Sequence, residues 1–185
     1  TPNGQRRILG SFVHGSMANA LPHAIGSQYA APDRQVISLS GDGGLSMLLG
    51  ELLTLRNHAL PVKVVCFNNS SLGMIKLEMM VDGLPSWETD HEQVDYAAIA
   101  RAMGIHAVRV EDPARLRAGI REVLGHDGPA LLDVVTDGNA LSIPPNITLE
   151  QVKGFALAVS RTVLGGGVGK MLTLARSNLR NIPRP

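Results

Sequence analysis

The sequence has little cysteine, little net charge and no long apolar run. Its one cysteine, Cys66, excludes an intrachain disulfide and a cysteine-rich metal site, and it favours a reducing compartment. A net charge of +1 at pH 7 argues against a nucleic-acid binder held by bulk charge. No apolar run approaches the roughly 18 residues that span a bilayer. We expect no signal peptide, and the opening residues 1–4 suggest a chain cut from a longer protein.

Aromatic residues are also scarce, at 3% of the 185 positions, although 44% of the residues are hydrophobic. That apolar content is typical of a chain with one sizeable core, which must be packed mainly with Leu, Val, Ile, Ala and Met. Twenty glycines and eleven prolines indicate many tight turns. The length suits one α/β domain.

Short apolar segments alternate along the chain with segments of helical spacing. Strands are predicted at 35–40, 62–67, 107–110 and 130–135, and helices at 18–31, 45–58, 96–103 and 113–124. The strands are almost continuously apolar, which is typical of parallel strands buried on both faces. The predicted fold class is therefore α/β, a three-layer, mostly parallel sheet with helices on both faces.

The charge is distributed unevenly. Residues 161–185 contain five basic and no acidic residues, so residues 1–160 carry a net charge of −4. Glycines at 165–167 and 169 indicate flexibility near this break. We expect a globular domain over 1–160 and a basic, glycine-hinged tail over 161–185.

The tail itself predicts a basic amphipathic helix over residues 170–180. Its apolar side is expected to carry Met171, Leu172, Ala175 and Leu179. Such a helix either docks on its own domain or lies at the surface of an anionic membrane. The pattern alone leaves both alternatives open.

Gly41-Asp42-Gly43-Gly44 follows a predicted strand and leads into a predicted helix. Glycines allow a ligand close to the backbone, the N–H groups of a helix start favour an anion, and Asp42 adds a hard oxygen ligand. Together these features suit a diphosphate bridged to the protein by Mg²⁺. The alternative is a plain turn in which Asp42 caps the next helix.

A second polar turn, Asn68-Asn69-Ser70-Ser71, follows the next predicted strand. Asn69 lies 27 residues after Asp42, one helix and one strand later. Neighbouring parallel strands end at the same edge of a sheet, which is where α/β proteins bind ligands. A carboxylate, an amide oxygen and a main-chain carbonyl could then share one Mg²⁺, although Asn-Asn is also a common turn pair.

Gly41-Asp42-Gly43, followed at this distance by Asn68-Asn69, resembles the diphosphate-binding signature of thiamine-diphosphate enzymes. The segment 10–22 is more specifically similar to the pyruvate dehydrogenase (quinone) or pyruvate oxidase branch, and the segments 143–145, 149–151 and 153–155 agree with it. The likeness covers nearly the whole chain but only the C-terminal, diphosphate-binding third of such an enzyme.

The resemblance implies a role for each matching position. Asp42, Asn69 and the Ser71 carbonyl would ligate Mg²⁺. Gly43 and Gly44 would offer N–H groups to the diphosphate. The cofactor-binding residues implied in all are His14, Gly15, Ser16, Met17, Gly41, Asp42, Gly43, Gly44, Asn69, Ser71, Leu72 and Gly73.

Within that set, the Gly15 carbonyl would accept a hydrogen bond from the aminopyrimidine ring, and Met17 would wedge the cofactor into a bent shape. The stretch 72–94 would form part of the substrate pocket and its cover, with Met74 and Glu78 as the implied catalytic residues. Met74 stands where an aromatic residue is common in the branch. Without the resemblance, Met17 suits a core position and Glu78 a solvated helix face.

The implied function is oxidative decarboxylation of pyruvate, with thiamine diphosphate and Mg²⁺ as cofactors and a quinone as electron acceptor. FAD, and a glutamate needed to protonate the aminopyrimidine, would come from domains that the chain lacks, so the chain alone is expected to be inactive. The branch also implies a homo-oligomer, homotetrameric in the complete enzyme, that is cytoplasmic and peripheral at the inner face of the cell membrane.

Two alternatives remain at this point. One is the equivalent domain of a non-oxidative thiamine-diphosphate enzyme such as acetolactate synthase. The other is a non-catalytic anion-binding domain, which predicts no Mg²⁺-dependent cofactor binding.

Overall fold

The computed structural model describes residues 6–140 and 147–179 of the chain. Residue contacts divide the chain into two compact units. The sheet unit comprises Thr1–Asn68 and Gln93–Thr136, and the helical unit comprises Asn69–Glu92 and Asp137–Pro185. The two units do not meet at residue 160, where a boundary was predicted. Residue 160 lies inside the helix Leu149–Leu164.

The sheet unit contains four strands: β1 (Ile37–Gly41), β2 (Lys63–Asn68), β3 (His106–Val110) and β4 (Ala130–Val135). They lie in the order β1-β2-β4-β3, and every neighbouring pair is parallel. Helices connect them along the chain: α1 (Ala20–Ala30), α2 (Asp42–Met47), α3 (Leu52–Asn57), α5 (Tyr96–Ala102) and α6 (Leu116–Gly125). Each predicted strand is present, within two residues of its expected ends.

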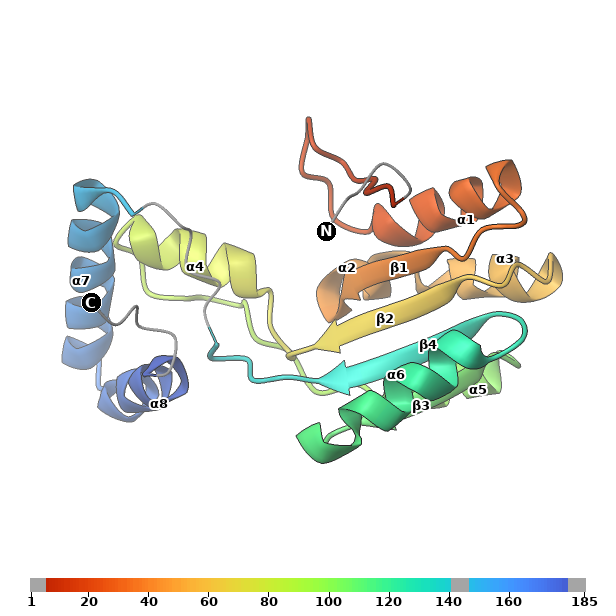
Figure 1. Ribbon diagram of the computed structural model, residues 1–185. Helices are drawn as coiled ribbons and strands as arrows, with labels where there is room; N and C mark the ends of the chain where they lie inside the picture. The colour runs from red at the N-terminus through yellow and green to blue at the C-terminus, as the bar shows by residue number, and fades with distance from the viewer. Residues whose placement is uncertain (1–5, 141–146, 180–185) are drawn as a thin grey trace. The chain divides into compact units, whose positions relative to one another are not determined.

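Alternating side chains of the strands build a core on each face of the sheet. Val64 and Cys66 of β2 pack with buried residues of α1, α2, α3 and α5, whereas Val65 packs on the other face with Leu132 of β4 and Val123 of α6. Figure 1 shows α6 in front of the strands and α5 behind them. The predicted three-layer α/β architecture is confirmed.

The segment predicted as one helix over 45–58 is interrupted. α2 ends at Met47, a short 3₁₀ turn covers Leu49–Glu51, and α3 starts at Leu52. Leu48 adopts a non-helical conformation at φ −129° and ψ 36°, and its side chain is largely exposed. Leu45 before the break and Leu52 and Leu55 after it are all buried in the core.

The helical unit consists of α4 (Gly73–Val81), α7 (Leu149–Leu164) and α8 (Val168–Asn178). Met80, Ala158 and Leu174, one from each helix, are buried together at its centre. Neither α4 nor α7 was predicted from the sequence. A usable signal for α7 was the capping box, in which the Thr148 hydroxyl accepts from the Gln151 N–H and the Gln151 side chain accepts from the Thr148 N–H.

The glycines at 165–167 form the end of α7. The N–H groups of Gly165, Gly166 and Gly167 donate to carbonyls of the last turn, and Gly166 adopts a φ of +88° that favours glycine. The predicted helix in the tail is present as α8. It docks through Leu174 and Met171, while Leu172 and Leu179 of the expected apolar side are exposed.

No helix in the described part of the chain combines the length and apolarity needed to cross a bilayer. Whether the exposed residues of α8 touch a membrane surface stays a prediction.

Gly154 of α7 provides a test of packing inside the helical unit. A Cβ at this position would overlap the Val81 carbonyl at the end of α4. We expect Gly154→Ala to destabilise this unit by roughly 1–3 kcal/mol, as overpacked sites commonly do. Thermal unfolding would measure the loss.

Gly169→Ala is the matched control, because this helical glycine of α8 has open space around it. Alanine there should be neutral or stabilise by up to about 1 kcal/mol, through its higher helix propensity. Equal unfolding midpoints for the two variants would contradict the close approach of α4 and α7.

Candidate functional site

The turn after β1 presents Asp42 at the carboxyl edge of the sheet. Gly41 is extended, and Asp42 is the first residue of α2. The Asp42 side chain is buried, with 2% of the residue exposed, and its Oδ1 accepts a hydrogen bond of 2.8 Å from the Gly43 N–H. The Asp42 side chain therefore bonds within its own turn, at the first residue of α2. The N-cap position is occupied by Gly41, so Asp42 is not a simple helix cap.

The loop that precedes α1 lies beside this turn. A Cβ on Gly44 would come 3.4 Å from the Ala18 nitrogen, so the glycine permits a close backbone approach. The loop turns sharply, with positive φ at Gly15 and Ala18 and a hydrogen bond of 2.7 Å from the Gly15 N–H to the Ser11 carbonyl. His14, Gly15, Ser16 and Met17 on this loop are all exposed. The sheet unit thus places the predicted cofactor-binding residues 14–17 on a loop beside the glycine turn at 41–44.

The predicted ligands after β2 belong to the helical unit, although Asn69 is joined directly to Asn68 at the end of β2. The Asn69 Oδ1 accepts from the Ser71 N–H at 3.0 Å, and a Cβ on Gly73 would lie 3.2 Å from the Asn69 Nδ2. Ser71 is buried, and its hydroxyl donates to Asp90 Oδ1 at 2.8 Å. Leu72 is half-buried at the start of α4.

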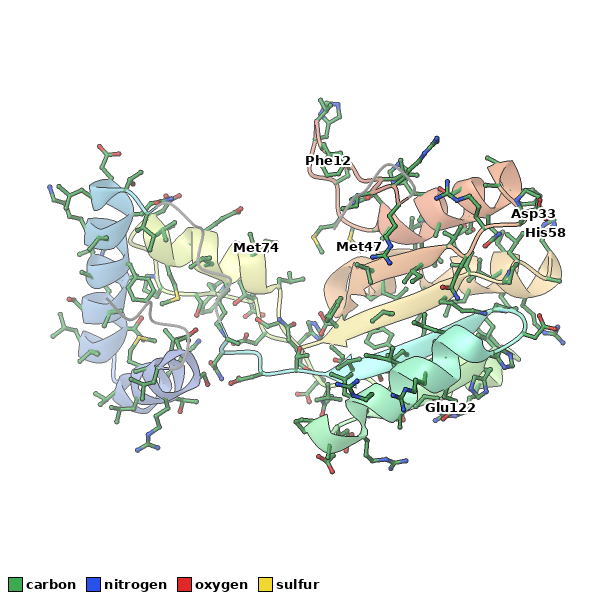
Figure 2. All side chains as sticks on the ribbon, in the orientation of Figure 1. Phe12, Asp33, Met47, His58, Met74 and Glu122 are labelled. Carbon is green, nitrogen blue, oxygen red and sulfur yellow. The ribbon has the colours of Figure 1, made fainter. Side chains whose placement is uncertain are left out.

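The predicted catalytic residues lie on α4. Met74 is 59% exposed, and Glu78 is exposed as well. Figure 2 shows Met74 at the start of this helix. Between them in sequence, Lys76 is buried and pairs with Asp90 at 3.0 Å. Burial alone would raise the pKa of Asp90, but hydrogen bonds from Lys76 and Ser71 lower it below its ordinary value.

A buried charged cluster below the carboxyl edge was missed by the sequence analysis. Asp133 of β4 is fully buried, and its Oδ2 accepts from Arg109 Nη1 of β3 at 2.6 Å and from the Tyr96 N–H at 3.1 Å. Its Oδ1 accepts from Asn68 Nδ2 at 2.9 Å. The available signal was one charged residue inside each of two otherwise apolar strands.

Tyr96 connects this cluster to the turn after β1. Its hydroxyl donates to the main-chain carbonyl of Asp42 at 3.2 Å, in a buried position. Burial, together with the negative charge of Asp42, raises the pKa of Tyr96 to about 12. Tyr96 is therefore a neutral hydrogen-bond donor at physiological pH. Burial likewise raises the pKa of the Cys66 thiol, which keeps it protonated.

The donor set predicted for Mg²⁺ fits that ion chemically. The Asp42 carboxylate, the Asn69 amide oxygen and the Ser71 carbonyl are hard oxygen ligands of the kind that Mg²⁺ prefers. Asp42 and Asn69 each accept a backbone hydrogen bond, but a carboxylate and an amide oxygen keep further lone pairs. In residues 6–140 and 147–179, no three His, Cys, Asp or Glu side chains form a group that could hold a metal ion. The predicted Mg²⁺ ligands are not such a group, because only one of the three, Asp42, is a carboxylate.

Residues 1–134 match the family model of the thiamine pyrophosphate enzyme, C-terminal TPP binding domain, where thiamine pyrophosphate is another name for thiamine diphosphate. The match covers most of the chain and includes the turns after β1 and β2. The chain belongs to this family.

Relatives define the similarity further. The chain is 39% identical over 154 residues to YdaP of Bacillus subtilis (strain 168), a protein named for its thiamine pyrophosphate and not for a reaction; 83% of this chain and 27% of YdaP are covered. It is 36% identical over 140 residues to the mitochondrial acetolactate synthase catalytic subunit of Aspergillus candidus, covering 75% of this chain and 20% of that protein.

Among solved structures, the chain resembles the thiamine diphosphate-dependent 4-hydroxybenzoylformate decarboxylase of Rhodococcus jostii RHA1. The TM-score is 0.62 at 27% identity, covering 66% of this chain and 24% of that one. The chain therefore spans about a quarter of the length of the relatives that it matches. The named relatives include acetolactate synthases and a decarboxylase, and this range supports the cofactor more strongly than the pyruvate oxidase branch.

Arg109 gives a test of the buried charged cluster. Arg109→Leu would leave the Asp133 carboxylate buried without its cationic partner. We expect a loss of about 3–5 kcal/mol in the free energy of unfolding, the usual cost of breaking a buried pair. Arg117→Leu, at an exposed position of α6, should change it by no more than about 0.5 kcal/mol. Denaturant titration would compare the two, and similar midpoints would contradict the role of this pair.

Proposed function

We propose that this chain is the diphosphate- and metal-binding domain of a thiamine-diphosphate enzyme that acts on 2-keto acids. The observation that carries the proposal is the buried Asp42 in a glycine turn at the carboxyl end of β1. Membership of the family supports it, because the matched region includes this turn and Asn69.

In this proposal Asp42, Asn69 and the Ser71 carbonyl hold Mg²⁺, and Gly43 and Gly44 face the diphosphate. When bound, thiamine diphosphate supplies a nucleophilic carbon and an electron sink for decarboxylation. The chain's contribution is to bind and orient. His14, Ser16, Gly41, Leu72 and Gly73 are proposed to line the same site.

Met17 and the Gly15 carbonyl would set the orientation of the cofactor, since both lie on the loop beside Gly44. Met17 is 43% exposed, which leaves surface for a ligand to cover. Met74 and Glu78 would face the substrate from α4. Glu78 is exposed.

For the reaction, we favour a non-oxidative one of the acetolactate synthase kind. Acetolactate synthases from a fungus, bacteria and archaea align with the chain at 32–36% identity. This class needs no flavin chemistry for net electron transfer. The substrate of this chain would then be a small 2-keto acid such as pyruvate.

A second candidate is the oxidative decarboxylation of pyruvate with FAD and a quinone. The segment 10–22 and the basic residues after 160 favour it. FAD would be bound outside this chain, and α8 would be the part that meets a membrane surface. A complete protein containing this chain separates the candidates: acetolactate formation supports the first, and pyruvate-dependent reduction of a quinone analogue supports the second.

Cofactor binding tests the proposal directly. Calorimetric titration of the full chain with thiamine diphosphate should show binding that requires Mg²⁺. Asp42→Ala should weaken it at least about tenfold, equivalent to roughly 1.4 kcal/mol, because a charged metal ligand is lost.

Asp33→Ala is the control, since Asp33 is exposed and lies before β1, at the end of the sheet opposite Asp42 (Figure 2). The affinity of the Asp33→Ala variant for thiamine diphosphate should equal that of the unchanged chain. Binding that is indifferent to both Mg²⁺ and Asp42 would favour the non-catalytic anion-binding domain instead.

Turnover gives a further prediction. Incubated with pyruvate, thiamine diphosphate and Mg²⁺, the chain alone should form no acetolactate and reduce no dye, because it spans about a quarter of its relatives. Sustained turnover, assayed colorimetrically and by dye bleaching, would show that the chain contains a complete active site and would contradict this part of the proposal.

A further inference from the structure

We propose that Asp133 is a positioning residue that holds the two ligand-bearing turns in place from below the carboxyl edge of the sheet. The inference rests on the proposed function, in which Asp42 and Asn69 bind the metal. It assigns a role to a buried carboxylate that touches neither the metal nor the cofactor.

The first connection runs from Asp133 to the turn after β1. The carboxylate accepts from the Tyr96 N–H at 3.1 Å, which fixes the start of α5. The Tyr96 ring is 2% exposed, and its hydroxyl donates to the Asp42 carbonyl at 3.2 Å. One side chain therefore links the buried carboxylate to the main chain of the proposed metal ligand.

The second connection runs from Asp133 to the turn after β2. The other carboxylate oxygen accepts from Asn68 Nδ2 at 2.9 Å, and the same amide group donates to the Val94 carbonyl at 2.8 Å. The Asn68 carbonyl accepts from the Thr136 N–H at 2.8 Å. Asn68 is thus held at both its side chain and its main chain, and the next residue is Asn69.

The amide orientation of Asn68 follows from its partners. Asp133 and the Val94 carbonyl are both acceptors, so the NH₂ group must face them. The Asn68 Oδ1 is then buried without a hydrogen-bond partner among the described residues. An unsatisfied buried acceptor costs free energy, so Asn68 keeps this orientation at some cost to the stability of the fold.

The ion pair between Asp133 and Arg109 also supports a positioning role for Asp133. Buried ion pairs contribute little net stability, and apolar residues of similar volume often replace them without loss. Their charge-assisted hydrogen bonds are directional, however, and each fixes a partner in one geometry. Asp133 uses both oxygens in this way, and each oxygen leads to a different turn.

The decisive variant is Tyr96→Phe, which removes the hydroxyl bonded to the Asp42 carbonyl and keeps the ring. Amide hydrogen exchange of the ligand-free chain should become about tenfold faster at Gly43 and Gly44. Calorimetry should show about fivefold weaker binding of thiamine diphosphate, with a higher Mg²⁺ concentration at half-saturation. Tyr29→Phe, at an exposed tyrosine of α1, should change neither quantity.

Val123→Ala controls for loss of stability. Val123 of α6 is fully buried in the core on the other face of the sheet, so its truncation lowers the unfolding midpoint without touching Tyr96 or Asn68. If positioning is the cause, Val123→Ala retains the affinity and the exchange rates at Gly43 and Gly44. If affinity falls in parallel with the midpoint in both variants, Asp133 and Tyr96 are merely structural and the inference is overturned.

Asp133→Asn tests the shared origin of the two connections. It keeps the shape but removes the charge and one acceptor, so exchange should accelerate at Gly43, Gly44 and Asn69 together. Acceleration at none of them would overturn the inference, whether or not the cofactor binds. Failure of the unchanged chain to bind thiamine diphosphate would refute the proposed function and leave the exchange results to decide the positioning role.

Discussion

Parallel pairing of β1 with β2 is the constraint on which the candidate site depends. The register places Gly41 opposite Phe67, so Asp42 and Asn68 are the next residues along their strands at one edge of the sheet. Antiparallel strands would send these ends to opposite edges. Helices cover both faces of β2, whereas β1 buries Ser38 and Ser40 and leaves Ile37 and Leu39 exposed. The chemistry of the edge thus follows from strand direction.

Much of this arrangement could be predicted from the sequence, because apolar strands between turns produce a strong local signal. β4 was found with its correct ends, and the turn at Asp42 follows from a strand that stops at glycine. α4 and the break at Leu48 were not found, because short helices and local bends depend on tertiary packing. Asp133 was missed for a related reason: its partners Arg109 and Asn68 lie 24 and 65 residues away, beyond any local pattern.

The cofactor is better determined than the reaction, and the distribution of residues explains the difference. Binding of a diphosphate through a metal uses a short turn and backbone N–H groups, which a family can retain while its chemistry changes. Discrimination between electron transfer and carbon–carbon bond formation depends on what surrounds the substrate. Only α4, with Met74 and Glu78, is proposed to contribute to that surrounding here. The family model and the names of two relatives specify thiamine diphosphate, whereas the reactions that the relatives' names describe differ.

The hydrogen bond from the Gly43 N–H to the Asp42 carboxylate does not argue against metal binding. A carboxylate has about four lone-pair positions on two oxygens, and this bond occupies one of them on Oδ1. It also restricts the side chain to one orientation before any ligand arrives, which reduces the conformational entropy lost on binding. The Tyr96 hydroxyl restrains the main chain of the same residue through its hydrogen bond to the Asp42 carbonyl. A turn that holds its own acidic residue in place is thus consistent with a preorganised ligand, and a freely rotating Asp42 would be the poorer metal site.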